Sequence, residues 1–301
     1  MPSDAQRATL TAAVLALASG LLLGLLSVTT RVGIRQAPSI GAAGLVLNGT
    51  SFLVAAVVAG VRGVSAEDFA LSGLWPFLLM GVCIPGFTQI AWLWAVDKAG
   101  PSRTQTVIAT SPLVAALLAV GLLSEPWNAA LIGGTILVVA GGIALVWERR
   151  RPVDFSLVGV AIALTLAVML GMRDTGVRWA LPDATTNSAL GAAATLLTAT
   201  ITVVVLASVL PRWRYSLAQF LPTAAVMAAP GVLMGAQYVL FFEAFARGRV
   251  TLVAPLLSTH ALWSVVIAAV VLRGAEVVNR RLVLATTLIV GGAALVTAFR
   301  S

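Results

Sequence analysis

The sequence predicts an all-α integral membrane protein with ten transmembrane helices, arranged as two inverted five-helix repeats. Three observations lead to this prediction. The 301 residues are 59% hydrophobic and only 10% charged, whereas soluble domains contain about 45–50% apolar and about 25% charged residues. The apolar residues fall into ten runs, and a bilayer core needs about 20 such residues per helix. Similar residues also recur about 150 positions apart, so the two halves of the chain resemble each other.

Short connections join the predicted spans, and none of them is long enough to form a soluble domain. The charged stretch 148–154 divides the chain into a first repeat, 1–150, and a second repeat, 151–301. No small-residue cleavage site follows a short apolar core near the N-terminus, so we expect no cleaved signal peptide. The predicted spans are 9–30, 39–61, 70–96, 103–123, 127–147, 156–177, 184–210, 222–245, 251–272 and 281–299.

The net charge of +8 does not indicate a nucleic-acid partner. Almost all basic residues lie in the connections, where basic flanks of membrane spans account for them. The single cysteine, Cys83, forms no internal disulfide. The sequence contains no His-Glu-x-x-His, Gly-x-Ser-x-Gly or phosphate-loop motif, so we expect neither a cofactor nor an enzyme. A membrane-embedded enzyme and a non-transporting sensor or scaffold are the alternatives from other classes.

The internal repeat has a mechanical consequence. Five spans per repeat is an odd number, so the second repeat must enter the membrane from the opposite side. Two similar units of opposite orientation suit alternating access, because they can exchange conformations around a central site. The alternative is that duplication only builds a larger bundle. Pairs at an offset of 149 are Gly86 with Gly235, Gln89 with Tyr238, Ala95 with Ala244 and Ser111 with His260; pairs at 147 are Gly24 with Gly171 and Arg31 with Arg178.

Residues 95–145 carry a recognisable combination of features. Ala95 lies near the end of the third span, Ser111-Pro112 follows a Ser/Thr-rich start to the fourth, Glu125 lies at the next turn, and Gly141-Gly142 lies in the fifth span. This segment resembles an EamA domain of the drug/metabolite transporter superfamily. Residues 244–296 resemble it less fully, because His260-Ala261 stands where the family pattern has Ser-Pro. The resemblance implies a secondary transporter; relatives move amino acids, other small metabolites, nucleotide-linked compounds or organic cations.

Polar side chains deep inside the spans are the candidate substrate-binding residues. Asn48 lies about 13 Å into the second span, where an amide must face protein or water rather than lipid. Gln89 and Trp92 on the third span pair by the repeat with Tyr238 and Phe241 on the eighth, where Gln237 is a further candidate. Inverted symmetry would make these two sets the walls of one central cavity. Hydrogen bonding between helices without a ligand is the alternative.

Arg173 lies about 25 Å along the sixth span. It either snorkels to the interface or contacts a substrate carboxylate.

Glu243 with Arg247, and Asp174 with Arg178, are four residues apart, so each pair is predicted to form an ion pair near the interface. Prolines within spans, at positions 85, 112, 230 and 255, permit helix kinks.

His260, the only histidine, lies about 13 Å into the ninth span. Its repeat partner is Ser111, and both are predicted to approach the axis between the repeats, with Trp263 as an apolar wall beside the imidazole. Because imidazole titrates near neutral pH, His260 is a candidate for coupling transport to protons. The alternative is a neutral histidine hydrogen-bonded to Thr110 or Ser111.

The sequence therefore predicts a secondary transporter, with export favoured, of a small polar metabolite such as an amino acid. Organic cations, drugs and nucleotide-linked metabolites are the alternative substrates. The expected partners are the solute, the lipid bilayer and protons, and the expected state is a monomer or weak oligomer in a bacterial inner membrane. Six basic residues flank the side of the termini and twelve flank the other, which by the positive-inside rule places the termini outside. The family arrangement implies cytoplasmic termini, and we favour it.

Overall fold

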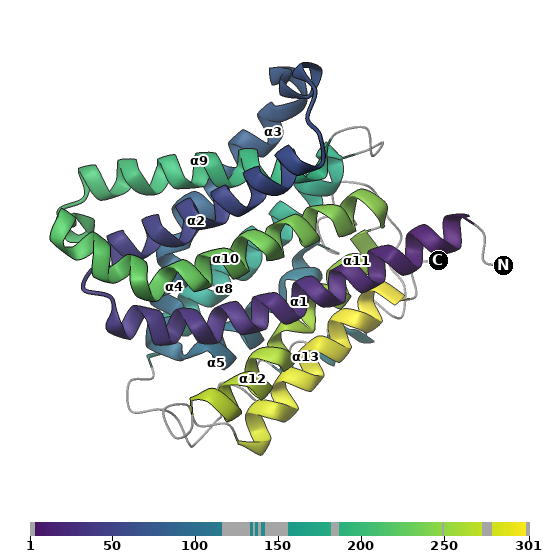
Figure 1. Cartoon of the computed structure of the whole chain (residues 1–301). Helices are drawn as coiled ribbons and strands as arrows, with labels where there is room; N and C mark the ends of the chain where they lie inside the picture. Colours follow the sequence, from purple (N-terminus) through teal and green to yellow (C-terminus); the bar gives the residue numbers. More distant parts are fainter. Residues whose placement is uncertain are drawn as a thin grey trace.

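Helices running roughly alongside one another make up the computed structural model of this protein (Figure 1). The structure describes residues 4–115, 133–134, 136–137, 140–141, 156–181, 187–248, 250–272 and 279–298. No strand occurs among these residues, so the all-α class is confirmed for them. The helices are α1 (Asp4–Gln36), α2 (Ile40–Val61), α3 (Leu71–Gly81), α4 (Thr88–Ala99), α5 (Pro101–Ile108), α8 (Leu157–Ala180), α9 (Ser188–Val209), α10 (Leu217–Arg247), α11 (Val250–Ser258), α12 (His260–Val271) and α13 (Arg280–Ala298), with short helical turns at Ala66–Phe69, Val82–Phe87 and Pro211–Trp213.

Within the described ranges, six helices are long and apolar enough to cross a membrane. They span Arg7–Gln36, Ile40–Val61, Leu71–Ala99, Leu157–Ala180, Ser188–Val209 and Leu217–Arg247, and Leu256–Val271 is a shorter apolar helix. These helices make the chain a multi-pass membrane protein. The predicted span 127–147 lies mostly outside the described residues, and the span 103–123 is described only as far as residue 115.

Capping residues explain where several helices begin. The Ser39 side chain accepts a hydrogen bond from Ala42 N before α2, and Asn187 accepts from two backbone amides before α9. Ser216 forms a capping box with Gln219 at the start of α10. Such caps satisfy amide groups that have no partner in the first helical turn. Gly100 adopts φ 87°, which lets the chain reverse between α4 and α5.

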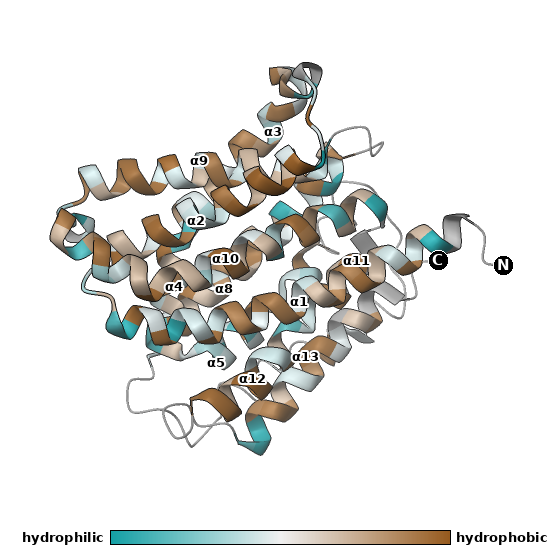
Figure 2. Ribbon diagram, in the orientation of Figure 1, coloured by the Kyte–Doolittle hydropathy of each residue, from teal (hydrophilic) through white to brown (hydrophobic). Residues whose placement is uncertain are grey.

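The outer surface is apolar, as lipid requires. Hydrophobic residues cover the helices along most of their length (Figure 2). Leu53, Val57 and Leu221 are 61%, 64% and 70% exposed, an arrangement that water would penalise and hydrocarbon does not. Trp75 and Trp179 form an edge-on pair with ring centroids 5.9 Å apart, and exposed tryptophans of this kind are typical of the membrane–water interface.

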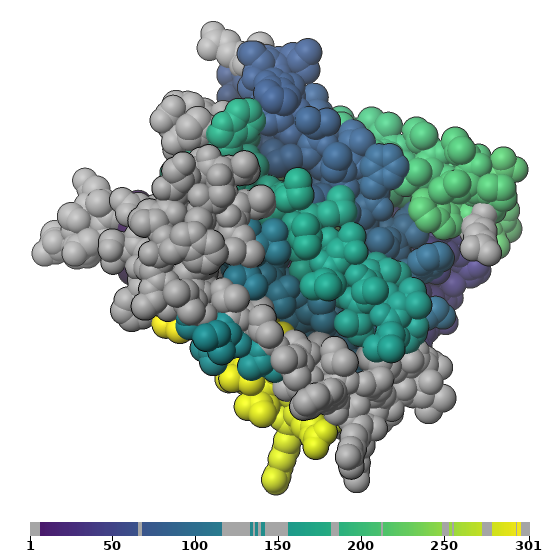
Figure 3. Space-filling view, turned by 180° about the vertical axis from the view of Figure 1, so that it is seen from behind, coloured from purple at the N-terminus to yellow at the C-terminus, as the bar shows by residue number. Residues whose placement is uncertain are grey.

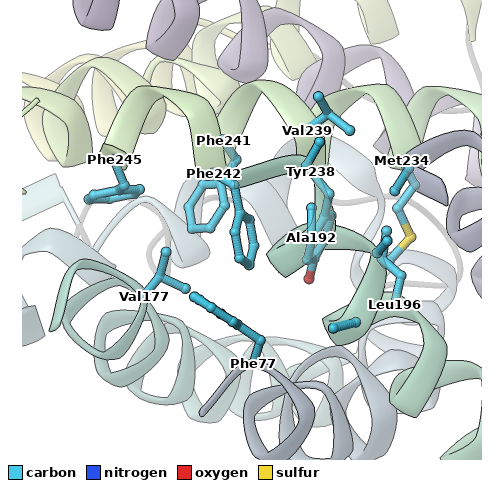
Figure 4. Packing of buried hydrophobic residues seen from close by; sticks show 14 of the residues in the cluster. Phe77, Val177, Ala192, Leu196, Met234, Tyr238, Val239, Phe241, Phe242 and Phe245 are labelled. Carbon is cyan, nitrogen blue, oxygen red and sulfur yellow. The ribbon is translucent and has the colours of Figure 1, made fainter. Parts of the chain in front are cut away.

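An aromatic ladder on α10 forms the centre of the core. Phe241, Phe242 and Phe245 point from α10 toward Phe77 of α3 and Val177 of α8 (Figure 4). The rings of Phe77 and Phe242 lie 5.6 Å apart, and those of Phe241 and Phe245 lie 4.9 Å apart in an edge-to-face arrangement. Edge-to-face and tilted geometries are favourable for aromatic pairs. The ladder therefore fixes α10 against α3 and α8.

Glycines allow helices from the two halves to approach closely. A Cβ atom on Gly24 would meet Trp263 Cβ at 2.6 Å, and one on Gly171 would meet Ser111 O at 2.8 Å. In the same way a Cβ on Gly86 would lie 2.9 Å from Thr202 Cβ, and one on Gly235 would lie 2.7 Å from Ser51 O. Side chains at these positions would separate the helices.

Hydrogen bonds at the helix ends define two faces of the molecule. At the first, named here the Asp97 face, Arg31 at the end of α1 donates to Val96 O at 2.5 Å, and Ser156 N donates to Lys98 O at 3.0 Å. Thus α8 begins where α1 ends. At the opposite, Glu243 face, Arg178 at the end of α8 donates to Phe245 O at 3.1 Å.

These contacts show that α1 and α8 run in opposite directions. A Cβ on Gly248, just after α10, would lie 2.7 Å from Ala12 Cβ in the early part of α1. Hence α1 begins at the Glu243 face and ends at the Asp97 face, whereas α8 runs the other way. From behind, α8 lies beside the α3–α4 segment (Figure 3).

Candidate functional site: a central polar cavity

A cavity lies among α1, α4, α5, α8, α10, α11 and α12. Its volume is about 90 Å³, several times what one water molecule needs. Apolar residues such as Leu26, Trp92, Leu166 and Phe241 form much of its wall. The polar side chains among the described lining residues are Thr88, Gln89, Gln105, Ser111, Arg173, Asp174, Gln237, Tyr238, Ser258 and His260.

Breaks in three helices border this cavity. Between α3 and α4, Ile84 leaves helical geometry (φ −139°, ψ 112°) directly before Pro85. After α5 a short turn interrupts the helix, which begins again at Ser111. After α11 a short turn likewise precedes His260, where the helix begins again. Pro85 and Pro112 lie at or beside such breaks, whereas Pro230 lies inside unbroken α10. Broken helices inside membranes are tolerated where they line a cavity, and they commonly form transporter binding sites.

The breaks before Ser111 and His260 share one hydrogen-bond geometry. Thr110 N donates to Val107 O at 3.1 Å, and Thr259 N donates to Leu256 O at 3.3 Å. The two threonine hydroxyls donate to the same carbonyls, at 2.8 and 2.7 Å. Thr110 and Thr259 are 149 positions apart, which is the offset of the sequence repeat.

Seven of the nine candidate substrate-binding residues line the cavity. They are Gln89, Trp92, Ser111, Arg173, Gln237, Tyr238 and His260. Asn48 does not, because its amide folds back and donates to Gly44 O at 3.1 Å on its own helix. Trp263 does not either: it is 39% exposed. Three residues turn a helix by about 300°. The side chain of Trp263 therefore points in a different direction from that of His260 around the helix axis, and it does not lie beside the imidazole.

Arg173 neither snorkels nor stands alone. Its Nε and Nη2 atoms donate to Asp174 Oδ1 at 3.0 and 2.8 Å, and its Nη1 donates to the Tyr238 hydroxyl at 3.4 Å. The guanidinium also lies 4.3 Å from the centre of the Phe241 ring, a cation–π contact. Its side chain is 11% exposed, and its charge is fixed at the cavity wall.

Several polar atoms of the cavity wall have no protein partner. They are Gln89 Nε2, both side-chain polar atoms of Gln105, and His260 Nδ1. The predicted hydrogen bond from His260 to Thr110 or Ser111 does not occur at that nitrogen. Gln237, by contrast, donates to Ser19 Oγ at 3.0 Å and so holds α1 against α10.

Residues 10–147 match the EamA-like transporter family. The match covers the first predicted repeat, supports the drug/metabolite transporter superfamily, and points to a membrane transporter. No curated protein matches the sequence.

Solved structures share the fold of this chain. Sixteen chains match, and one of them, described only as "Crystal structure of protein", has a TM-score of 0.66 at 20% identity. The similarity covers 96% of this chain and 97% of that one. At this identity the similarity concerns the fold alone.

One of the two predicted ion pairs is confirmed and one is wrong. Glu243 pairs with Arg247, and it also accepts hydrogen bonds from Ser188 and from Arg62, the latter at 2.9 Å. Asp174 does not pair with Arg178, because Arg173 occupies its carboxylate while Arg178 donates to the carbonyl of Phe245. The prediction considered only residues one helical turn apart, and the adjacent arginine reaches the carboxylate directly.

Sequence reasoning missed four polar residues of the cavity, Thr88, Gln105, Asp174 and Ser258. Asp174 was assigned to the interface by its spacing from Arg178, although its position next to Arg173 was the better signal. Gln105 belongs to the polar run Ser102–Thr106, all of whose members are fully buried. A polar run at the start of an apolar span was the available signal. Across the described residues, no group of three His, Cys, Asp or Glu could hold a metal ion.

Proposed function

We propose that the protein is a secondary transporter that moves a small polar metabolite, such as an amino acid, by alternating access around the central cavity. The observation that carries this proposal is the cavity itself. It lies inside the bundle, is lined by polar side chains, and is bordered by breaks in three helices. A static bundle gains nothing from interrupting its helices at a polar cavity, whereas a transporter needs segments that move around its solute.

The paired contacts support two repeats of opposite orientation. Arg31 and Arg178, 147 positions apart, each lie in the last turns of a helix and donate to a carbonyl near the end of another helix, Val96 or Phe245. Gly24 and Gly171 likewise approach the backbone at His260 and Ser111. These contacts recur at the sequence offsets of the repeat, and α1 and α8 run in opposite directions. Equivalent but opposed halves are what alternating access requires.

Charged groups connect helix ends at both faces of the molecule. At the Asp97 face, Arg31 lies 3.6 Å from the Asp97 carboxylate. At the Glu243 face, Glu243 joins Arg62, Arg247 and Ser188, and so connects the ends of α2, α9 and α10. We take these two clusters as the gates, of which one opens while the other stays closed.

The proposal includes the setting of the protein. It places the chain in a bacterial inner membrane as a monomer or weak oligomer, with both termini in the cytoplasm and export as the favoured direction. His260, buried at the cavity, is the candidate group for proton coupling. These assignments extend the family's general role to this chain.

Uptake measurements in proteoliposomes test the proposal. The purified protein is reconstituted, and a panel of labelled amino acids and other small metabolites is offered with and without a pH gradient. We expect saturable movement of at least one solute above liposomes that lack the protein. If no solute moves under any gradient, while the protein keeps a cooperative unfolding transition, the transporter assignment is wrong.

A further inference from the structure

We propose that Asp174 sets the charge selectivity of the cavity, so that the cavity takes a solute of no net charge carrying a carboxamide-like or urea-like group. The inference rests on the proposed function, since it treats the cavity as the solute site. Asp174 has no part in that function as stated above. It lies beside Arg173 at the cavity wall and is 4% exposed.

Asp174 already compensates the charge of Arg173. Two of its nitrogen atoms donate to one oxygen of Asp174, at 3.0 and 2.8 Å, and Tyr238 and Phe241 hold the guanidinium from other sides. A solute carboxylate would therefore have to compete with a carboxylate that the chain itself holds in place. A carboxylate that is not balanced by a positive group of the same solute would also add an uncompensated negative charge to a buried site, which is strongly unfavourable.

The charged side chains that line the cavity balance each other. Of the described residues that line the cavity, Arg173 and Asp174 are the ones with formally charged side chains, apart from the titratable His260. In the arrangement that the structure shows, a protonated His260 would face Arg173 with no second carboxylate available, so we count the imidazole as neutral in this arrangement. A cationic solute would meet the same lack of a counter-ion. The cavity is thus electroneutral and disfavours ions of either sign.

Among the described residues, three side chains at the cavity have polar atoms without a hydrogen-bond partner. Gln89 and Gln105 each present an unpaired amide nitrogen, Gln105 also presents an unpaired amide oxygen, and His260 presents an unpaired ring nitrogen. These three side chains are 3%, 0% and 4% exposed, so bulk water does not satisfy them. Leaving such groups unpaired costs free energy, and a solute that both donates and accepts removes that cost. A carboxamide or a urea group does both within a few ångströms.

Matched solutes separate this proposal from its alternatives. L-Glutamine and L-glutamate differ by an amide against a carboxylate, and L-citrulline and L-arginine differ by a urea group against a guanidinium. Binding of each is measured by calorimetry on the full-length purified protein in lipid nanodiscs. We expect at least one neutral member to bind about tenfold or more tightly than its charged counterpart, the factor typical of one unpaired buried charge or lost hydrogen bond.

Two variants and a control test the role of Asp174. Asp174→Asn leaves the Arg173 charge uncompensated, so the preference should shift by about tenfold or more toward glutamate over glutamine. Arg173→Gln leaves Asp174 uncompensated and should shift the preference toward arginine over citrulline. Because the two variants test the same ion pair, either one suffices if the other fails to fold. Asp68→Asn makes the same chemical change at a carboxylate outside the cavity, where Asp68 accepts from Ser65, and should keep the wild-type preference.

The outcomes distinguish this inference from the proposed function. If neither neutral solute binds more tightly than its charged counterpart, or if a folded Asp174→Asn variant keeps the wild-type preference, the charge-selectivity proposal is overturned. Binding does not require transport. A protein that shows the expected preference but moves no solute in proteoliposomes would overturn the transport function while supporting the electroneutral site.

Discussion

Arg173 shows how one side chain is held inside a membrane protein. Its burial is made tolerable by Asp174, Tyr238 and Phe241 together. Removing one partner of a buried ion pair costs about 3–5 kcal/mol because the other charge is left unpaired. Replacing both partners by neutral groups of similar shape avoids that cost.

Substituting Arg173 alone should therefore destabilise the protein more than substituting the pair. We expect Arg173→Gln to lower the free energy of unfolding by about 3–5 kcal/mol, and Arg173→Gln combined with Asp174→Asn to restore most of it. Reversible unfolding in mixed micelles, followed by circular dichroism, measures both. An additive loss in the double variant would mean that the two side chains do not stabilise each other.

In the proposed function, His260 is the candidate residue for proton coupling. Glutamine keeps a hydrogen-bond donor and acceptor at this position but cannot titrate. We expect His260→Gln to lose accumulation driven by a pH gradient and to keep exchange of labelled for unlabelled solute. Both are measured in proteoliposomes with the solute that the panel identifies. Unchanged pH dependence in the variant would make His260 a structural residue.

At the scale of helices, glycine contacts set the spacing between elements. Gly24 brings α1 against α12, where an added Cβ would lie 2.6 Å from Trp263 Cβ and 2.9 Å from Ser264 N. Backbone atoms cannot yield as a flexible side chain can. Gly60, near the end of α2, has nothing within 4 Å of the same added atom, so the two glycines differ only in their surroundings.

This difference predicts opposite effects of one substitution. Gly24→Ala should lower the free energy of unfolding by about 1–3 kcal/mol, as overpacking does in protein interiors. Gly60→Ala, the matched control, should leave stability unchanged or raise it by about 0.5–1 kcal/mol, because alanine is the better helix former. Unfolding in mixed micelles compares them. Equal stability of the two variants would contradict the close approach of α1 and α12.

At the scale of the molecule, the two faces must lie on opposite sides of the membrane. Gln36, at the Asp97 face, and Ser65, beyond α2 at the Glu243 face, are both exposed. In a background in which the exposed Cys83 is replaced by serine, a single cysteine at either position reports its side.

Labelling of intact cells decides the orientation. With cytoplasmic termini, an impermeant maleimide should label Gln36→Cys from outside and should label Ser65→Cys only after the cells are opened. The reverse pattern would favour the distribution of basic residues over the family arrangement. Labelling of both cysteines from outside would contradict the two-face architecture.

The sequence by itself determined the features that depend on lipid and on local geometry. Apolar runs fixed most of the described spans within a few residues, because the bilayer requires continuous apolar helices of a set length. Helical spacing was sufficient for Glu243 and Arg247, since both lie on one helix a single turn apart. Buried polar groups in apolar spans pointed to Gln89, Arg173, Tyr238 and His260, which indeed line one cavity.

Only the tertiary structure decided which groups meet across helices. Asn48 bonds to its own helix, Trp263 lies outside the cavity, and Asp174 binds Arg173 rather than Arg178. Spacing along a helix fixes the angle of a side chain around that helix, but not the rotamer it adopts or the neighbour it faces. Those depend on how closely glycine-containing helices approach and on which buried charges must be compensated, and both arise only when the chain has folded.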